Sequence, residues 1–263
     1  MIHTDPEALL AALAWQVDLG ADEAIGDAPV DRFAPPEPVE TAEAVAAPSV
    51  TKPAKPDSGA PDAATQATVL ASAATTLADL RAAMEGFEGC DLRHGARNFV
   101  FSDGFAAADL MIVGEAPGRE EDREGRPFVG RSGQLLDRML AAIGRDRTAD
   151  TAGQGVYITN VLPWRPPANR DPSKDEMAMM KPFLLRHIEL AAPRALLLLG
   201  NSAMKTLFET ERGITAMRGT WHEVAGVPAI ASFHPAALLR NGLNKRPAWA
   251  DLLDLKAKLE ATE

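Results

Sequence analysis

The sequence predicts an α/β fold whose centre is a parallel sheet of four strands covered by helices on both faces. Four short apolar runs are typical of buried strands, and helical patterns lie between or after them. The runs are Leu110–Val113, Val156–Val161, Ala195–Leu199 and Ala229–Phe233. Strands that alternate with helices pair in parallel, so helices are expected on both sides of the sheet.

Helices are predicted where apolar residues recur at helical spacing. The stretches are Leu77–Met84, Ser132–Ile143, Lys174–Ala191, Ser202–Glu209 and Arg246–Leu259. Ahead of one of them, Gly200 ends a strand, and either Asn201 or Ser202 can cap the helix that follows. The α/β domain is therefore expected to span residues 64–263.

The first 63 residues have a different character. Residues 1–27 form an acidic segment in which Pro6–Leu19 is expected to be helical, with Asp5 as N-cap. Residues 28–63 are rich in Pro, Ala, Asp and Glu and almost lack large apolar side chains. Such a segment buries too little apolar surface to offset its ordering entropy, so a disordered linker is predicted.

Charge is distributed unevenly along the chain, whose net charge is −10. Residues 1–63 hold 12 acidic and 3 basic residues, a net of −9, so the other 200 residues carry only −1. Residues 212–246 hold five basic residues and one acidic residue, a net of +4. This local basic surface can attract phosphates, although each of these residues can equally be ordinary solvated surface.

Several classes of protein are disfavoured by the composition. No apolar run approaches the ~20 residues that span a bilayer, and the acidic N-terminus lacks the basic region of a secretory signal. A cytoplasmic protein without membrane contact, and a monomer, is expected. The single cysteine, Cys90, excludes an intramolecular disulfide and any all-cysteine metal cluster within one chain.

Ligands of parallel sheets bind beyond the carboxyl ends of the strands, where four unusual loops are predicted here. The loops begin "GEAPGREEDREGRPFVGRSG" at Gly114, "TNVLPWRPPANRDP" at Thr159, "GNSAMK" at Gly200 and "SFHPAALLRNGLNKRPAW" at Ser232. A glycine-rich turn usually cradles phosphate, but the carboxylates of the first loop would repel one. Taken singly, His234 can be a packed or capping residue, Asn160 a turn residue and Phe128 a core residue.

Together these loops resemble the motifs of the family four uracil-DNA glycosylases. "GEAPGREEDREGRPFVGRSGQLLD", "ITNVLPWRPPANRDPSKDE" and "SFHPAALLR" carry the resemblance, which covers about residues 78–259. It implies a three-layer α/β/α fold, removal of uracil from DNA in base excision repair, and no metal in the chemistry. The abasic site would be left for other enzymes.

The resemblance also implies roles for individual side chains. Glu115 and Glu121 would position or polarise the attacking water, and His234 would face the oxygen that becomes anionic as the base departs. Phe128 would stack on the flipped uracil, and Asn160 would read its edge. These roles suit the chemistry, because an aromatic face repays part of the cost of base flipping, and an Asn amide matches the N3–H donor and O4 acceptor of uracil.

Further positions follow from the same resemblance. Gly114 and Ala116 would lie beside the base. Residues expected to contact DNA are Ser202, Leu238, Leu239, Arg240, Lys245 and Arg246, among which Leu238 to Arg240 would enter or brace the duplex. The glycines of the first loop let the backbone approach the substrate, and its carboxylates would lie near a developing cation rather than a phosphate.

One departure from the resembled family concerns its four-iron, four-sulfur cluster, which is held by four cysteines. At the corresponding positions this chain has Phe87, Cys90, Trp164 and Met180. Phenyl, indole and thioether groups cannot replace thiolates. The cluster is therefore predicted to be absent, with an apolar plug in its place and Cys90 as a small buried hydrophobe.

Two other functions are weighed against glycosylase activity. A nucleotide-binding hydrolase would use the first loop for phosphate, which its carboxylates and its lack of lysine oppose. A non-catalytic DNA-binding relative could keep the fold after losing the cluster, although the joint presence of Glu115, Phe128, Asn160 and His234 favours an enzyme.

The N-terminal arm carries a separate hypothesis. Gln16–Leu19 resembles the start of peptides that dock on bacterial sliding clamps, although Gly20 stands where a Phe is expected. Residues 1–25 could thus recruit a clamp while the linker leaves the domain free. The alternative is an amphipathic helix that packs on the domain through Leu9, Leu13 and Val17.

Overall fold

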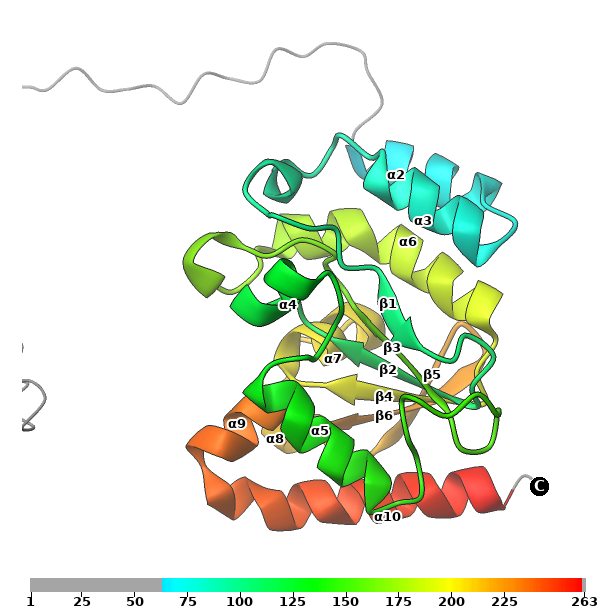
Figure 1. The fold of residues 1–263 in the computed structure, drawn as a ribbon, viewed down its shortest axis with the longest axis vertical. Coiled ribbons are helices and arrows are strands. Elements are labelled where there is room, and N and C mark those ends of the chain that lie inside the picture. Colours follow the sequence, from blue (N-terminus) through cyan, green and yellow to red (C-terminus); the bar gives the residue numbers. More distant parts are fainter. Residues whose placement is uncertain (1–62, 262–263) are drawn as a thin grey trace, which may run out of the picture. The chain divides into compact units, whose positions relative to one another are not determined.

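A six-stranded mixed sheet lies at the centre of the computed structural model, which describes residues 63–261 (Figure 1). The strand order is β1-β3-β2-β4-β6-β5. Its four inner strands are parallel to one another, and the predicted strands are confirmed: β2 (Leu110–Gly114), β3 (Val156–Asn160), β4 (Ala195–Leu199) and β6 (Val227–Ser232).

The prediction of four strands is corrected by two edge strands. β1 (Ser102–Gly104) pairs antiparallel with β3, and β5 (Trp221–Val224) pairs antiparallel with β6. β1 is three residues long and has no apolar side chain, and β5 is exposed along much of its length. Edge strands bury little surface, so neither gives the continuous apolar run by which inner strands are recognised.

Each inner strand sends alternate side chains to opposite faces, as a pleated strand must. In β2, Met111 and Val113 face one apolar core and Leu110 and Ile112 face the other. The first core is covered by α2 (Ala63–Ala73), α3 (Leu77–Glu85), α6 (Lys174–Ala191) and α7 (Asn201–Phe208), and the second by α5 (Arg131–Ala141) and α10 (Lys245–Glu260). The three-layer α/β/α arrangement is thereby confirmed (Figure 1).

The five predicted helices are present with ends shifted by at most two residues. α2 was missed because it is alanine-rich and has no strong apolar stripe; its Ala67 and Ala71 are buried. The other missed elements are short and lie in loops: η1 (Asp91–His94), α4 (Arg119–Glu124), η2 (Pro167–Asn169), α8 (Ile214–Met217), α9 (Pro235–Arg240) and η3 (Gly242–Asn244).

The predictions for the first 62 residues, namely helix 6–19, the linker and the clamp-binding segment, lie outside the described residues. The described part starts at Ala63 in α2, one residue before the predicted domain start. Across residues 63–261, none of the helices combines the length and the apolar character that crossing a membrane requires.

A buried ion pair ties α10 to the end of β6. The Asp251 side chain is 1% exposed, accepts a hydrogen bond from Ser232 Oγ (2.6 Å) and forms a salt bridge with Arg218. Arg218 Nε donates to Asp251 Oδ2 at 3.0 Å, and a second nitrogen donates to Pro247 O. Ser232 immediately precedes the loop of His234, so this pair fixes the base of that loop.

We expect Asp251→Ala to lower the free energy of unfolding by about 3 kcal/mol, because it leaves a largely buried guanidinium without its counter-ion. The measurement is chemical denaturation followed by circular dichroism. Lys256→Ala on the same helix is the matched control: its partner Glu260 is exposed, so its loss should cost less than about 1 kcal/mol. Equal effects of the two substitutions would contradict the importance given to the buried pair.

Candidate active site

A cavity of about 430 Å³ opens beyond the carboxyl ends of the inner strands. Its walls come from the loops that follow β2, β3, β4 and β6, as the rule for parallel sheets predicts. The lining side chains and backbone belong to Glu115, Ala116, Asn169, Asp171, Leu199, Gly200, Asn201, Ser202, Ile214, Phe233, His234, Ala236, Ala237 and Arg240. Its volume falls in the range typical of small-molecule sites.

Glu115 stands at the wall formed by the first loop. One carboxylate oxygen, Oε2, accepts a hydrogen bond from the Ser202 hydroxyl. Burial raises the pKa of Glu115, and the negative charge of Asp171 raises it further, while the Ser202 hydrogen bond acts in the opposite direction. The carboxylate is thus held by one oxygen and is a better base than an exposed glutamate.

His234 is the N-cap of α9 and faces the cavity from the opposite wall. Its Nδ1 accepts a hydrogen bond from Ala236 N (3.2 Å). Burial lowers the pKa of His234 to about 4, with a further contribution from the charge of Arg240. The ring is therefore neutral near pH 7 and carries its proton on Nε2, which makes it a hydrogen-bond donor.

The approach of His234 depends on Gly200, which precedes α7. A Cβ built on Gly200 would lie 3.1 Å from the His234 Cβ. Gly200 also has φ of +93°, a left-handed conformation that disfavours other residues. Glycine at this strand end thus lets two loops meet.

Gly114, Phe128 and Asn160 converge beside this cavity without lining it. Gly114 on β2 pairs in register with Asn160 on β3. A Cβ on Gly114 would lie 2.4 Å from Asn160 Oδ1 and 2.6 Å from the Phe128 ring. The Phe128 ring in turn contacts His234, with centroids 5.4 Å apart and planes tilted by 31°. An amide and an aromatic ring therefore meet at Gly114, and the ring links them to the imidazole of His234.

The side chain of Asn160 is notable for its missing partners. The residue is 5% exposed, yet within residues 63–261 its amide forms no hydrogen bond to the protein. No side-chain nitrogen or oxygen in residues 63–261 is both fully buried and unpaired, so the amide keeps some contact with solvent. Its donor and acceptor are thus available to a bound molecule.

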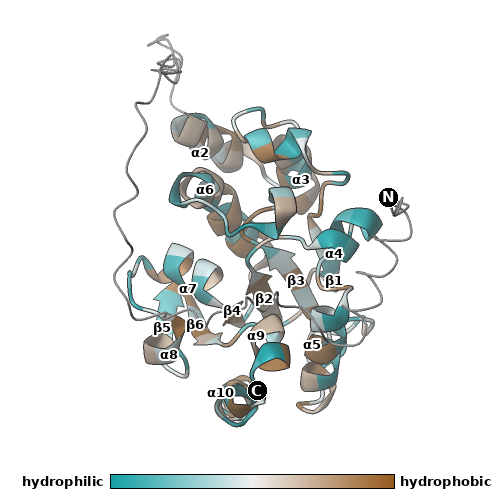
Figure 2. Cartoon of the chain, turned by 90° about the vertical axis from the view of Figure 1, so that its left-hand side faces the viewer, coloured by the Kyte–Doolittle hydropathy of each residue, from teal (hydrophilic) through white to brown (hydrophobic). Residues whose placement is uncertain are grey.

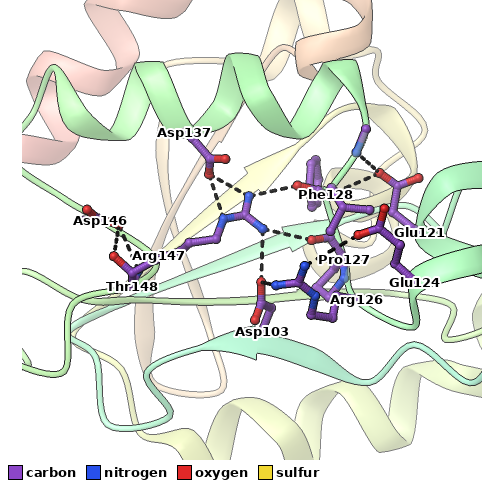
Figure 3. A network of polar contacts seen from close by, with 12 residues as sticks. Asp103, Glu121, Glu124, Arg126, Pro127, Phe128, Asp137, Asp146, Arg147 and Thr148 are labelled. Carbon is purple, nitrogen blue, oxygen red and sulfur yellow. Dashed lines mark hydrogen bonds and ion pairs between the residues drawn. The ribbon is translucent and has the colours of Figure 1, made fainter.

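Phe128 is held in an unfavourable backbone conformation by Arg147 (Figure 3). The φ angle of Phe128 is +53°, which costs about 1–3 kcal/mol for a non-glycine residue. Arg147 donates to Pro127 O (3.1 Å) and to Phe128 O (2.9 Å). The same guanidinium binds Asp137 at 2.7 Å and Asp103 at 3.1 Å. The position of the ring is therefore set by a network anchored on β1 and α5.

Glu121, predicted to help position water, has both oxygens engaged with backbone. Oε1 accepts from Val129 N (3.0 Å) and Gly130 N (2.9 Å), and Oε2 accepts from Gly118 N (3.1 Å). Three N–H donors bind a carboxylate strongly. These contacts make Glu121 a brace of the loop next to Phe128, and of the two glutamates predicted to act on water only Glu115 lines the cavity.

The residues predicted to contact DNA separate into two groups. Arg240, Lys245 and Arg246 are exposed, and Arg240 lines the cavity. Leu238, by contrast, is 2% exposed and packs in a cluster with Phe233 and Ala248, so it is a core residue of this segment.

The exposed apolar side chains of the same segment are Leu239 and Leu243, which are 41% and 85% exposed. Leu243 was not singled out from the sequence. Its signal was present in "RNGLNKR", an apolar residue isolated among polar ones in a loop.

The four positions that correspond to cluster ligands do not fit a four-iron, four-sulfur cluster. Cys90 is the only cysteine of the chain and is buried. Phe87, Trp164 and Met180 are each at most 4% exposed and belong to the same apolar core as Cys90. Burial raises the pKa of the Cys90 thiol, which opposes the thiolate form that binds metal.

Residues 101–253 match the profile of the uracil DNA glycosylase superfamily. The chain belongs to this superfamily. It is 42% identical over 158 residues to the Type-4 uracil-DNA glycosylase of Archaeoglobus fulgidus, an alignment that covers 57% of this chain and 76% of that relative.

Two further relatives give the same picture. The Type-4 uracil-DNA glycosylase of Sulfurisphaera tokodaii is 40% identical over 161 residues, which cover 58% of this chain and 70% of the relative. That of Thermotoga maritima is 39% identical over 160 residues, which cover 59% and 79%. The family resemblance stated from the motifs is thereby confirmed.

Sequence reasoning missed two polar residues of the cavity. Asn169 and Asp171 reach it from the loop after β3. Both lie in "PPANRDP", where the prolines indicated a rigid loop but did not indicate which side chains face the site. Asp171 is important because its charge acts on Glu115.

We expect Gly114→Ala to lower the free energy of unfolding by about 1–3 kcal/mol, because the added methyl group collides with Asn160 and Phe128 in a packed site. Chemical denaturation measures it. Gly153→Ala is the control, since a Cβ there meets no atom within 4 Å. A Gly114→Ala protein as stable as the control would show that the strands do not hold these side chains together.

Proposed function

We propose that this chain is a DNA repair glycosylase that flips uracil out of DNA and hydrolyses its N-glycosidic bond, leaving an abasic site. The observation that carries the proposal is the nearly buried amide of Asn160 beside the Phe128 ring, which in turn contacts the neutral imidazole of His234. Its relatives named Type-4 uracil-DNA glycosylase support the same reaction.

Recognition of uracil follows from the donors and acceptors of the base. Uracil offers an N3–H donor beside the O4 acceptor, and the Asn160 amide offers the matching acceptor and donor. Cytosine presents the reversed pattern, which mismatches the amide in the orientation that places Oδ1 toward Gly114. A site whose buried polar groups are left unpaired can reject such an analogue by roughly 10⁴-fold. Stacking on Phe128 would return about 1–3 kcal/mol of the cost of flipping.

Cleavage breaks the bond between C1′ of the sugar and N1 of uracil, and N1 keeps the electron pair. Negative charge then develops on the base, largely on O2, and positive charge on the sugar. His234 would stabilise the base by donating from Nε2–H, without transferring its proton. Because the pKa of His234 is lowered to about 4, this donor state persists across the neutral range.

Water completes the reaction by adding to C1′. Glu115 would orient it through Oε1, the oxygen that Ser202 does not occupy, and its raised pKa suits it to accept the proton that water releases. Glu121 would act indirectly by holding the Phe128 loop. The negative charge of the Glu115 carboxylate would also stabilise the positive charge that develops on the sugar.

We expect Asn160→Ala and His234→Ala each to slow uracil excision at least about 10²-fold, the usual cost of one lost transition-state donor. Uracil-containing oligonucleotides, single- and double-stranded, are incubated with the full chain and treated with alkali to cleave abasic sites. His222→Ala, on the exposed strand β5, is the matched control and should retain full activity.

Wild-type rates in both site variants would contradict the assigned roles. Binding of DNA without any excision by the unmodified chain would instead favour the non-catalytic DNA-binding relative. Circular dichroism of each variant separates loss of chemistry from loss of fold.

We further propose that the enzyme works without an iron–sulfur cluster. A single cysteine supplies one of four thiolates, and bulky side chains fill the neighbouring core. The purified protein is expected to be colourless, to hold no stoichiometric iron or sulfide, and to excise uracil in EDTA. A brown preparation with bound iron and sulfide would overturn this proposal.

The remaining proposals concern the setting of the enzyme. We place it in the cytoplasm as a monomer, with residues 1–25 as a recruiting arm for a sliding clamp. Deleting residues 1–60 should leave excision of short oligonucleotides intact. A labelled 1–25 peptide should bind purified clamp at roughly tens of micromolar; no binding there would exclude the arm as a clamp ligand.

A further inference from the structure

Helix α4 exposes both of its arginines and two of its four carboxylates, those of Glu120 and Glu124. Asp122 is buried and accepts hydrogen bonds from Arg97 N (2.8 Å) and Asn98 N (3.1 Å). The Arg119 and Arg123 side chains, one helical turn apart, are exposed. Figure 2 shows α4 as a hydrophilic helix. The acidic sequence "GREEDRE" therefore presents arginines to solvent while its most buried carboxylate serves the fold.

These arginines line a second cavity of about 430 Å³, distinct from the active-site cavity. Three segments far apart in sequence supply its lining, which consists of Arg97, Arg119, Arg123 and Arg165 together with Glu120 and Asp122. Four cations against two anions give the lining a charge of +2. No apolar side chain is among the lining residues.

The arginines keep much of their binding capacity. Within residues 63–261, neither Arg97 nor Arg119 forms an ion pair. Arg123 pairs with its exposed neighbour Glu124 at 3.3 Å, and Arg165 is 3.9 Å from Asp122. Guanidinium groups that are not neutralised by partners are suited to phosphate, whose oxygens they bind in pairs.

The two acidic groups of the lining are partly engaged elsewhere. Asp122 Oδ1 accepts from two backbone N–H groups, as described above, and the Glu120 carboxylate lies against Gly130, where a Cβ would be 2.2 Å from its Oε2. They offset part of the positive charge but leave it in excess.

The position of the second cavity relates it to the active site. Arg165 Nε donates to Asn169 Oδ1 at 2.7 Å, and Asn169 lines the active-site cavity. Arg119 and Arg123 follow β2 and Arg165 follows β3, whereas Arg240, Lys245 and Arg246 follow β6. Because β4 lies between β2 and β6, the arginines and the basic segment are on opposite sides of the active-site cavity.

We propose that the four-arginine cavity binds backbone phosphates of DNA on one flank of the flipped nucleotide, while the basic segment at Arg240–Arg246 holds the other flank. The identity of the ligand rests on the proposed function. The binding chemistry rests on the lining alone, since a lining with an excess of guanidinium groups over carboxylates attracts a polyanion and releases its counter-ions on contact.

The test compares full-length wild type with Arg119→Gln/Arg123→Gln and the control Arg81→Gln, an exposed arginine on α3. Fluorescence anisotropy measures the affinity for a labelled uracil-free duplex from about 50 to about 200 mM salt. The slope of log K against log[salt] is negative, and each lost phosphate contact reduces its magnitude by about 1. For the double variant we expect the magnitude of this slope to be smaller than that of wild type by about 2. The ratio of wild-type to variant affinity should then fall about 16-fold between the lowest and the highest salt concentration. The control should have the wild-type slope.

A second readout uses the position of uracil in the substrate. On duplexes with long flanks the double variant should raise KM and leave kcat unchanged. Two further duplexes carry uracil near the 5′ end or near the 3′ end of its strand. The rise in KM should disappear for only one of them, because only one flank of the uracil reaches the cavity. An unchanged salt slope together with an unchanged KM would overturn the proposal.

Further arms separate the remaining outcomes. Arg119→Gln alone removes no ion pair of the fold and should reduce the magnitude of the slope by about 1. This single variant therefore tests the proposal even if the double variant does not fold. Thermal stabilisation of wild type by inorganic phosphate that is lost in the variant, with the DNA slope unchanged, would indicate a free-phosphate site and overturn the DNA assignment. A wild type that excises no uracil but keeps the arginine-dependent slope would defeat the proposed function and leave this inference standing.

Discussion

The site depends on the hydrogen bonds between charged side chains and the backbone around Phe128. Arg147 binds the carbonyls of Pro127 and Phe128, and Glu121 binds the N–H groups of Val129 and Gly130. These charge-assisted hydrogen bonds, each worth about 1.5–3 kcal/mol, offset the cost of the left-handed conformation of Phe128. Without these hydrogen bonds, the backbone conformation that places the Phe128 ring against Gly114 and His234 would not be stabilised.

The sheet supplies the other half of the geometry. Parallel pairing places Gly114 opposite Asn160, and the positive φ of Gly200 lets the loop of His234 approach from β6. The buried Asp251–Arg218 pair then fixes the start of that loop through Ser232. Side chains from three loops thus meet because the strands that carry them end at the same edge, and this edge is anchored by the ion pairs of Asp251 on α10 and Asp137 on α5.

Carboxylates and arginines divide their work in the first loop. Glu115 faces the cavity, Glu121 and Asp122 bind backbone N–H groups, and Arg119 and Arg123 face solvent. The many carboxylates of this loop suggest that it would repel nucleic acid, but its exposed arginines give it a positively charged surface. The core next to it uses Phe87, Trp164 and Met180 as ordinary apolar packing, which stabilises the domain by burial.

The sequence by itself determined the four inner strands, the helices that cover them except α2, the family and the loops that line the candidate site. Apolar runs and helical spacing report burial directly, and motif order reports ancestry. Only the tertiary structure decided that β1 and β5 complete the sheet, that Leu238 is buried while Leu243 is exposed, and that Glu121 braces backbone. It also brought Arg97, Arg119, Arg123 and Arg165 to one cavity. These facts depend on which side of a short helix or loop faces the core, and that choice is made by packing between segments distant in the chain, which local sequence patterns do not encode.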